Sequence, residues 1–244
     1  MPATPAWPPK SLPRLFVRAR LGEGARVDLD FAQANYLGNV MRLREGAELL
    51  TFDGHSGEWL ARIAEAGKKR MALVIERRIR EAEKMPDVWL AFAPVKRAQT
   101  DWLVEKATEL GVAKLLPVMT HRTIAERVKR ERLESIAIEA AEQCGRTVIP
   151  EIDEPVSLRE FLKTNGRTLY FADEGGGDPA ASSFKPGPVT ILTGPEGGFT
   201  DEERSAIRAS SGAVAISLGP RILRAETAAL AALASYMAVA GDWR

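Results

Sequence analysis

The side chains best suited to chemistry in this sequence lie in two loops rich in glycine and proline. The first loop, residues 192–200, reads LTGPEGGFT and stands between an apolar run and a predicted helix. Glycine and proline cost conformational entropy to order at such density. The backbone is therefore expected either to approach a ligand closely or to form a tight structural turn. The spacing matches neither the phosphate-binding motif GxxxxGK(S/T) nor the dinucleotide motif GxGxxG.

The second loop, residues 217–228, reads SLGPRILRAETA and also joins a predicted strand to a predicted helix. Its Gly219-Pro220 pair forces a turn. The polar side chains that follow the turn are Arg221, Arg224, Glu226 and Thr227. In parallel α/β sheets, ligands bind at the carboxyl ends of the strands, so two such loops at one sheet edge would enclose a small ligand.

Strands and helices that alternate along the chain from residue 88 would position these loops. The expected strands are 88–93, 115–119, 168–172, 189–193 and 213–218, and the expected helices are 97–110, 129–143, 201–210 and 225–240. Thr200 and Glu203 form a capping-box pattern, and Trp102 and Leu103 are expected on a buried helix face. The alternation is typical of an α/β domain on a mostly parallel sheet. Residues 173–188, rich in Gly, Pro and Ser, are expected to form a mobile loop.

The first 80 residues show a different pattern. Strands are expected at 14–17, 47–52, 58–64 and 71–79. A hairpin turn is expected at 53–57, where glycines allow positive φ, and Asp28 or Asp30 is expected to cap a short helix. Several short strands in so short a stretch indicate a small β-barrel. The charged residues 80–87 are interpreted as the linker between domains 1–80 and 88–244.

Composition limits the class of protein. The chain has 244 residues, of which 45% are apolar and 27% charged, so it can bury a core and is not disordered throughout. Residues 1–84 carry 15 Lys and Arg against 11 Asp and Glu, a net +4, whereas the remaining 19 and 22 give −3. A basic first third fits either a module that binds a polyanion or an ordinary solvated surface. No apolar run is long enough to span a membrane.

Histidine and cysteine are scarce. Two histidines and one cysteine predict no metal site and allow no internal disulfide. The lone Cys144, together with the absence of a recognisable secretory signal, favours the reducing cytoplasm. We interpret Cys144 as a packing side chain rather than a nucleophile.

Both loops resemble those of a known enzyme family. Residues 194–198, GPEGG, and 218–227, LGPRILRAET, resemble the RsmE-type ribosomal RNA methyltransferases, the 16S rRNA uridine-N3 methyltransferases of the SPOUT superfamily. Other matching segments, in the same order along the chain, are 35–44, 52–54, 106–112 and 142–146. The sequence departs from the family pattern at His121 and Thr123, where Glu and Ser are more usual, and at Asn35, where many relatives carry His.

The resemblance implies a fold and a cofactor. The larger domain would be a SPOUT-type α/β domain with a C-terminal trefoil knot, preceded by a small PUA-like β-barrel that helps to hold RNA. S-adenosylmethionine would bind in the knot against both loops, and the protein would be a homodimer. The implied cofactor-binding residues are Leu192, Thr193, Gly194, Pro195, Glu196, Gly197, Gly198, Leu218, Gly219, Arg221, Ile222 and Leu223.

The resemblance also implies methyl transfer to N3 of one uridine in 16S rRNA of the small ribosomal subunit. N3 carries a weakly acidic proton on the pairing edge, so the target base must be unpaired or flipped out. We expect Arg224 to orient the base and stabilise charge on the uracil oxygens. We expect Glu226 to position Arg224 or to accept the proton, unless the two residues form only a structural ion pair.

Basic residues of both domains are candidates for contacts with RNA phosphates, because guanidinium groups match phosphate oxygens. The expected RNA-binding residues are Arg14, Arg42, Arg44, Lys96, Arg97, Arg122 and Arg146. Two alternative functions stay open. One is a SPOUT enzyme with a different RNA target, and the other is a catalytically silent RNA-binding protein with the same fold.

Overall fold

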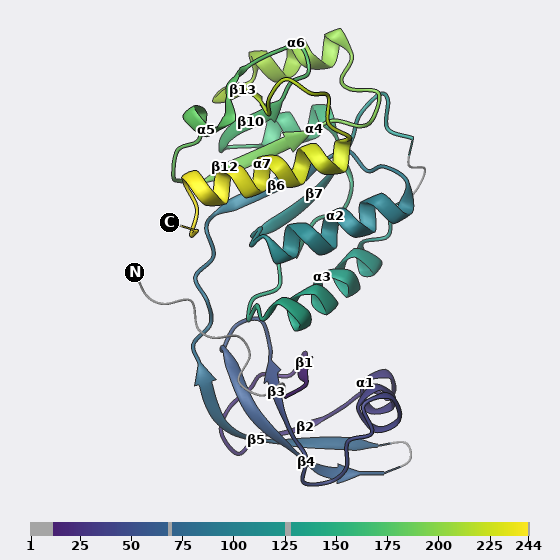
Figure 1. Ribbon diagram of the computed structural model, residues 1–244. Coiled ribbons are helices and arrows are strands. Elements are labelled where there is room, and N and C mark those ends of the chain that lie inside the picture. The colour runs from purple at the N-terminus through teal and green to yellow at the C-terminus, as the bar shows by residue number, and fades with distance from the viewer. Residues whose placement is uncertain (1–11, 68–69, 125–127, 244) are drawn as a thin grey trace. The chain divides into compact units, whose positions relative to one another are not determined.

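The computed structural model describes residues 12–67, 70–124 and 128–243, and the chain divides into two compact units (Figure 1). The first unit comprises Met1–Glu83 and Gly145–Val148, and the second comprises Lys84–Cys144 and Ile149–Arg244. Gly145–Val148 therefore belongs with the N-terminal unit, although the sequence places it well inside the domain predicted from residue 88 onward. In the described part of the chain, no helix has the length and hydropathy of a membrane span.

The first unit is built on a five-stranded sheet with the order β1-β3-β4-β5-β2. Its strands are β1 (Arg14–Phe16), β2 (Arg26–Asp28), β3 (Glu48–Phe52), β4 (Glu58–Ala66) and β5 (Met71–Arg80). β1 pairs with β3 in parallel, and the other pairings are antiparallel. The sequence predicted four of these strands. β2 was missed because its one apolar residue, Val27, stands between two charged residues and shows no apolar run.

The turn between β3 and β4 is organised by one carboxylate. Asp53 accepts hydrogen bonds from the backbone N–H groups of His55 (2.9 Å) and Ser56 (2.7 Å). Burial alone would raise the pKa of Asp53, but these N–H groups outweigh it and the pKa lies below its usual value. Gly57 has φ +94°, and a Cβ there would come within 2.2 Å of the Arg80 carbonyl oxygen, so only glycine fits.

A short helical segment lies between β2 and β3. Helix α1 (Phe31–Asn35) begins with a capping box, in which the backbone N–H of Gln33 donates to Asp30 Oδ1 at 2.8 Å. Asp30, one of the two candidates from the sequence, is therefore the cap. The chain continues as one π-helical segment, η1 (Tyr36–Val40), and then enters the left-handed region at Arg42, with φ 58°.

The second unit is an α/β domain on an eight-stranded parallel sheet. The main path has the order β11-β13-β10-β12-β6-β7-β8, and β9 pairs with β7. The strands are β6 (Val88–Phe92), β7 (Lys114–Met119), β8 (Glu151–Ile152), β9 (Val156–Ser157), β10 (Thr168–Ala172), β11 (Asp178–Pro179), β12 (Val189–Thr193) and β13 (Ala213–Ser217). The helices are α2 (Arg97–Glu109), α3 (Arg130–Cys144), α4 (Leu158–Thr164), α5 (Ala180–Ser183), α6 (Asp201–Ala209) and α7 (Ala225–Val239).

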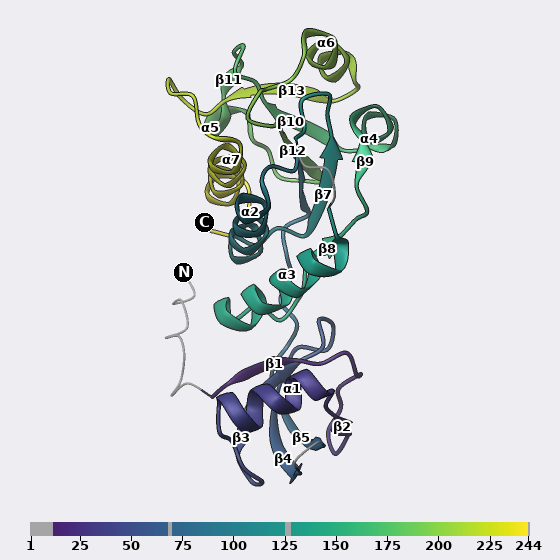
Figure 2. The same cartoon turned by 90° about the vertical axis from the view of Figure 1, so that its right-hand side faces the viewer.

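Helices cover both faces of this sheet (Figure 2). Buried side chains of α2, α3, α5 and α7 form one core with one face of the sheet, and those of α4 and α6 form a second core with the other. Neighbouring residues of β6 divide between the two cores, Leu90 facing the first and Ala91 the second, as the alternation of a strand requires.

Three local expectations from the sequence are wrong. Trp102 is 44% exposed, because the buried face of α2 runs through Leu103 and Val104 instead. Cys144 is exposed at the end of α3 and is not a packing residue. The stretch 173–188, expected to be a mobile loop, contains β11 and α5. β11 pairs with β13, and no local sequence pattern predicts this pairing.

Candidate functional site

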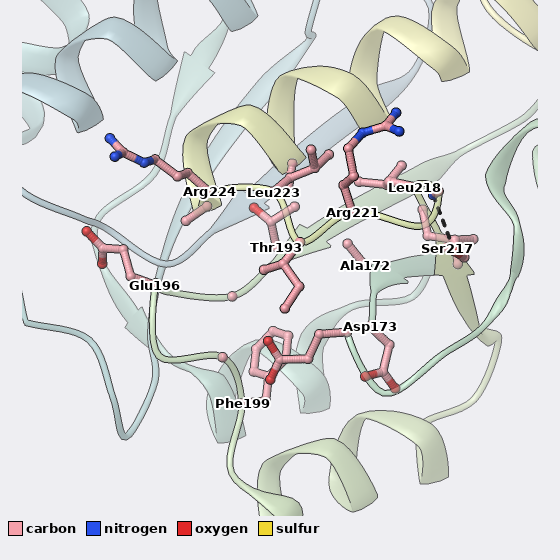
Figure 3. Close-up of a pocket in the computed structure, with 18 of the residues that line it drawn as sticks. Ala172, Asp173, Thr193, Glu196, Phe199, Ser217, Leu218, Arg221, Leu223 and Arg224 are labelled. Carbon is pink, nitrogen blue, oxygen red and sulfur yellow. Dashed lines mark hydrogen bonds between the residues drawn. The ribbon is translucent and has the colours of Figure 1, made fainter.

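A cavity of about 360 Å³ opens at the carboxyl ends of β10, β12 and β13 (Figure 3). Its walls come from the loops that follow these strands and from the first turn of α7. Two of these loops are those that the sequence predicted to enclose a ligand. The third follows β10 and contributes Ala172, Asp173, Glu174 and Gly176. Ligand binding at this edge of a parallel sheet follows the general rule for open α/β folds.

The loop after β12 needs its glycines for reasons of space. A Cβ at Gly194 would come within 3.1 Å of the Phe199 ring, which also lines the cavity. Gly198 has φ +66°, and a Cβ there would come within 2.2 Å of Oε1 of Glu174. The backbone N–H of Gly198 donates to the Pro195 carbonyl at 2.9 Å. This loop is therefore a tight turn whose backbone forms part of the cavity wall.

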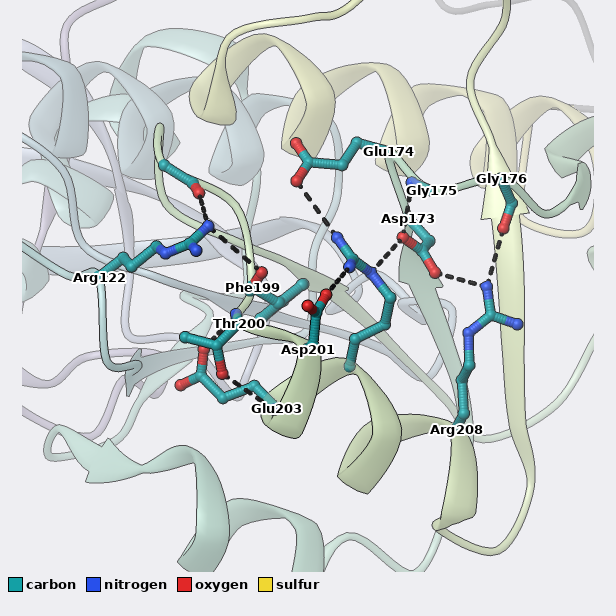
Figure 4. Close-up of polar contacts among 12 residues, drawn as sticks. Arg122, Asp173, Glu174, Gly175, Gly176, Phe199, Thr200, Asp201, Glu203 and Arg208 are labelled. Atoms are coloured by element: carbon teal, nitrogen blue, oxygen red, sulfur yellow. Dashed lines mark hydrogen bonds and ion pairs between the residues drawn. The ribbon is translucent and has the colours of Figure 1, made fainter.

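The same loop is held from outside the cavity by the turn after β7. Nη1 of Arg122 donates to the carbonyl oxygen of Gly197 at 2.6 Å (Figure 4). The backbone N–H of His121 donates to Glu203 Oε1 at 2.7 Å. Glu203 also closes the predicted capping box of α6 with Thr200. Arg122, expected to contact RNA, therefore helps to hold the loop in position.

Asp173 anchors the third loop. Its side chain is fully buried and accepts hydrogen bonds from Arg204 Nε (3.0 Å), Arg208 Nη2 (2.6 Å) and the backbone N–H of Gly175 (2.8 Å) (Figure 4). Burial alone would raise the pKa of Asp173, but the Gly175 N–H and the two guanidinium groups outweigh it, and the pKa lies below its usual value. The network ties the loop after β10 to helix α6.

The loop between β13 and α7 forms the remaining wall. Gly219, with φ +107°, turns the chain after Leu218, and Leu223 presents a second apolar side chain to the cavity. Ile222 reaches only the rim and is 92% exposed. Figure 3 shows the side chains of Arg221 and Arg224 extending in different directions from this loop.

The predicted cofactor residues lie around this cavity with two exceptions. Those that line it are Thr193, Gly194, Pro195, Glu196, Gly198, Leu218, Gly219, Arg221, Ile222 and Leu223. Leu192 is instead fully buried in the core shared with α4 and α6, and Gly197 faces Arg122 rather than the cavity. Leu192 faces away because successive residues of a strand point to opposite sides of the sheet, and Thr193 takes the side of the cavity.

The two predicted catalytic residues have different surroundings. Arg224 is exposed, lines the cavity and is the N-cap residue of α7. Glu226 lies in the first turn of α7, is only 9% exposed and is not part of the cavity wall. The structure records no ion pair between these two described side chains, so the structural pair considered from the sequence is absent.

Reasoning from sequence missed several side chains of this site. These are Asp173, Glu174, Phe199, Ser217, Pro220 and Ala228. The position of β10 in the sheet could have indicated Asp173, because a residue directly after a buried parallel strand lies at the ligand-binding edge.

Two of the predicted RNA contacts are buried in the first unit. Arg14 donates from Nε to Glu58 Oε1 at 2.6 Å and from Nη2 to the Arg146 carbonyl at 2.7 Å. The side chains of Arg14 and Arg146 are each 5% exposed. They hold Gly145–Val148 within the unit, and their burial leaves little surface for the expected contact with RNA phosphates.

The other predicted RNA contacts are accessible. Arg42 and Arg44 are exposed on the first unit, and Lys96 and Arg97 are exposed where α2 begins. Lys96 and Arg97 line a second cavity of the larger unit, of about 670 Å³. Lys129 and Arg132 also line it, and this cavity therefore has a basic wall.

Comparisons with known proteins converge on one family. A family model described as an RNA methyltransferase domain matches residues 82–237, and one described as an RNA methyltransferase PUA domain matches residues 29–76. The ribosomal RNA small subunit methyltransferase E of Rickettsia conorii is 32% identical over 227 residues, covering 91% of this chain and 93% of that protein. The protein of the same name from Synechocystis is 33% identical, covering 88% of this chain and 74% of that protein.

Solved structures agree. The ribosomal RNA small subunit methyltransferase E of Neisseria gonorrhoeae bound to S-adenosylmethionine superposes with a TM-score of 0.88 at 30% identity, covering 96% of this chain and all of that one. A methyltransferase of Legionella pneumophila in complex with the same cofactor gives a TM-score of 0.86 at 31% identity, covering 95% of this chain and 99% of that one.

Proposed function

Because the chain belongs to the small-subunit ribosomal RNA methyltransferase E family, we propose that it transfers a methyl group from S-adenosylmethionine to N3 of a uridine in 16S rRNA. The observation that carries the proposal is the cavity at the carboxyl ends of β10, β12 and β13. Its glycine-rich walls lie in the two loops whose sequences resemble the family's cofactor loops.

The residues of this cavity fit the cofactor. The volume of about 360 Å³ lies within the range of small-molecule sites. Leu218 and Leu223 supply apolar surface for an adenine ring, and the backbone at Gly194 and Gly219 carries no Cβ that would keep a ligand away. S-adenosylmethionine supplies an electrophilic methyl group on a sulfonium when bound.

The remaining chemistry falls to the chain's own side chains. Arg224, which is exposed and lines the cavity, would orient the uracil and stabilise negative charge on its oxygens as N3 loses its proton. A carboxylate oxygen would take that proton, and three carboxylates line the cavity whereas Glu226 does not. Asp173 and Glu174 are ion-paired with Arg204, and the structure records no ion pair for the described side chain of Glu196. We therefore propose Glu196 as the proton acceptor. Glu226, in the first turn of α7, would be a positioning residue. The methyl group replaces the proton on N3, and the spent cofactor leaves as the neutral thioether.

The same proposal covers the organisation of the protein. Residues 1–80 would hold RNA as a PUA-like domain, and residues 88–244 would form the methyltransferase domain, its C-terminal segments threaded as a trefoil knot. The family resemblance also supports a homodimer that acts on ribosomal RNA in the cytoplasm. No group of three or more metal-ligating side chains occurs among the described residues, and the proposed reaction assigns no role to a metal.

Two measurements test the function. Calorimetric titration of the chain with S-adenosylhomocysteine should show saturable binding that is lost when Leu223 is replaced by Trp. Purified small subunits from a strain lacking the modification should then gain a methyl group, which nucleoside analysis should locate at uridine N3. Methylation at a ribose or a guanine would support a different RNA target. The absence of cofactor binding to the folded protein would favour a catalytically silent RNA-binding protein.

A further inference from the structure

The helical segment of the first unit exposes an unusual amount of apolar surface. Four of the nine strongly exposed large hydrophobic side chains in the described chain lie between residues 31 and 41. They are Phe31 (72%), Tyr36 (38%), Val40 (62%) and Met41 (39%). Exposed aromatic and aliphatic groups at this density mark an interaction surface more often than an ordinary solvated one.

A hollow of about 330 Å³ lies along one side of this segment. Phe31, Ala34, Asn35, Gly38 and Asn39 line it, and their spacing follows a single helical face. Ala34 and Gly38 leave the face open because their side chains are small. A Cβ at Gly38 would already lie 3.4 Å from Cε of Met71 across the hollow.

Polar groups at the hollow are held in defined positions. Nδ2 of Asn39 donates to Oδ1 of Asn35 at 2.7 Å, which leaves the Asn35 NH₂ and the Asn39 oxygen to face other partners. Nη1 of Arg44 donates to the carbonyl oxygens of Gly38 at 3.4 Å and Leu43 at 3.3 Å. These contacts hold the guanidinium of Arg44 at the hollow, which Arg44 lines.

Two backbone features support a functional role for this segment. The chain runs through the π-helical η1 and then through the left-handed region at Arg42, a conformation that a side chain with a Cβ rarely adopts. Interruptions of both kinds concentrate at functional sites, where the surrounding structure maintains the strain.

We propose that this hollow binds one unpaired nucleotide of the RNA substrate, a refinement that rests on the proposed function. A base would stack on the Phe31 ring, its polar edge would meet the two asparagine amides, and the Arg44 guanidinium would meet a neighbouring phosphate. A paired base cannot present its face in this way. The net charge of +4 over residues 1–84 favours a polyanion over an acceptor site for another protein's apolar helix.

The test is binding of a fluorescein-labelled single-stranded oligouridine 10-mer to the full chain, followed by anisotropy. Phe31→Ala should weaken binding about tenfold, because the variant loses one base stack. Arg44→Ala should also weaken it and should reduce the dependence of log affinity on log salt by about 0.7, the value for one phosphate contact on a single strand. Val40→Ala is the matched control, since Val40 is 62% exposed on the same segment and does not line the hollow.

The outcomes separate this proposal from the enzymatic one. Affinity for S-adenosylhomocysteine should stay unchanged in all three variants, and Phe31→Ala should raise the KM for small subunits rather than lower kcat. Equal binding of the oligonucleotide by Phe31→Ala, Arg44→Ala and Val40→Ala would overturn the nucleotide site while leaving methyl transfer intact. Equally tight binding of a blunt duplex with the same sensitivity to Phe31→Ala would also overturn it. A change in sedimentation with Phe31→Ala would show instead that the surface joins two copies of the chain.

Discussion

The Arg122 guanidinium holds the Gly197 carbonyl oxygen at 2.6 Å across 75 residues of sequence. This contact fixes the glycine-rich loop from the side that faces away from the cavity, and a longer contact of 3.5 Å reaches the Phe199 carbonyl. The loop that forms one wall of the proposed cofactor cavity therefore depends on a side chain outside that cavity.

Arg122→Ala should weaken S-adenosylhomocysteine binding about fivefold, the scale of a charge-assisted hydrogen bond at a partly exposed site. Arg122→Lys should recover only part of this, because an ammonium is a point donor that does not reproduce the guanidinium fork. Calorimetry of these variants beside Arg159→Ala, an exposed arginine in α4, measures the effect. If Arg122 served RNA instead, the KM for RNA and the salt dependence would change while affinity for the spent cofactor stayed constant.

Gly198→Ala should lower affinity for S-adenosylhomocysteine by about tenfold. The left-handed backbone at φ +66° costs an alanine about 1–2 kcal/mol, and its Cβ must displace Glu174 from the neighbouring wall. Gly166→Ala is the matched control, since Gly166 has open space around it and no positive φ. Identical calorimetric constants for the two variants would show that the loop relaxes without cost.

Asp173→Asn should lower the free energy of unfolding by about 2–3 kcal/mol, because it leaves two guanidinium groups without their buried counter-charge. In a chain of this length that corresponds to a fall in Tm of about 5–10 °C. Asp201→Asn is the control, because Asp201 pairs with the same Arg204 but is 96% exposed, and an exposed pair contributes less than about 1 kcal/mol. Similar thermal shifts for the two variants would contradict the anchoring role of Asp173.

The pH dependence of that contribution has a definite sign. The folded-state pKa of Asp173 lies below its usual value of about 3.9. The stabilisation is therefore fully present above that usual value and disappears as pH falls through the lower, folded-state pKa. Asp173→Asn lacks this pH-dependent contribution. The free energies of unfolding of the variant and of the unsubstituted protein should therefore converge at low pH, which acid unfolding of both proteins measures.

Arg224→Ala should reduce kcat by about 100-fold or more with little change in affinity for S-adenosylhomocysteine, since its proposed role is to stabilise charge in the transition state. Glu196→Gln should reduce kcat by about 100-fold, as expected for the proton acceptor. Glu226→Gln should reduce kcat less. A larger loss of kcat in Glu226→Gln than in Glu196→Gln would identify Glu226 as the proton acceptor instead.

Local signals in the sequence identified most of the elements that place the site. The Thr200–Glu203 capping box and the apolar run before residue 193 predicted the two elements that frame the first loop, and both are present. The short strand β11 and helix α5 escaped detection because they are stabilised by β13 and α7 and have almost no period of their own. The glycines around them are typical of a mobile loop, and the sequence therefore predicted one.

The sequence did not show which charged side chains are buried. Arg14 and Arg146 have the residue type of phosphate ligands. The partners of Arg14, the Glu58 carboxylate and the Arg146 carbonyl, lie 44 and 132 residues away in sequence. Nothing local distinguishes them from the exposed Arg42 and Arg44. Residue type predicts what a side chain can bind, whereas burial depends on contacts that only the assembled fold supplies.

The return of Gly145–Val148 to the first unit has a consequence for dissecting this protein. The polypeptide passes from one unit to the other three times, after Glu83, after Cys144 and after Val148. One proteolytic cut at the linker would therefore separate residues 1–83 from Gly145–Val148, the part of their own unit that stays joined to the second unit. An N-terminal fragment ending at Glu83 would lack the carbonyl acceptors that Gly145 and Arg146 offer to Arg80 and Arg14. Such a fragment should be less stable than the same residues within the whole chain, so a circular permutant or an insertion at 145–148 would perturb both units together.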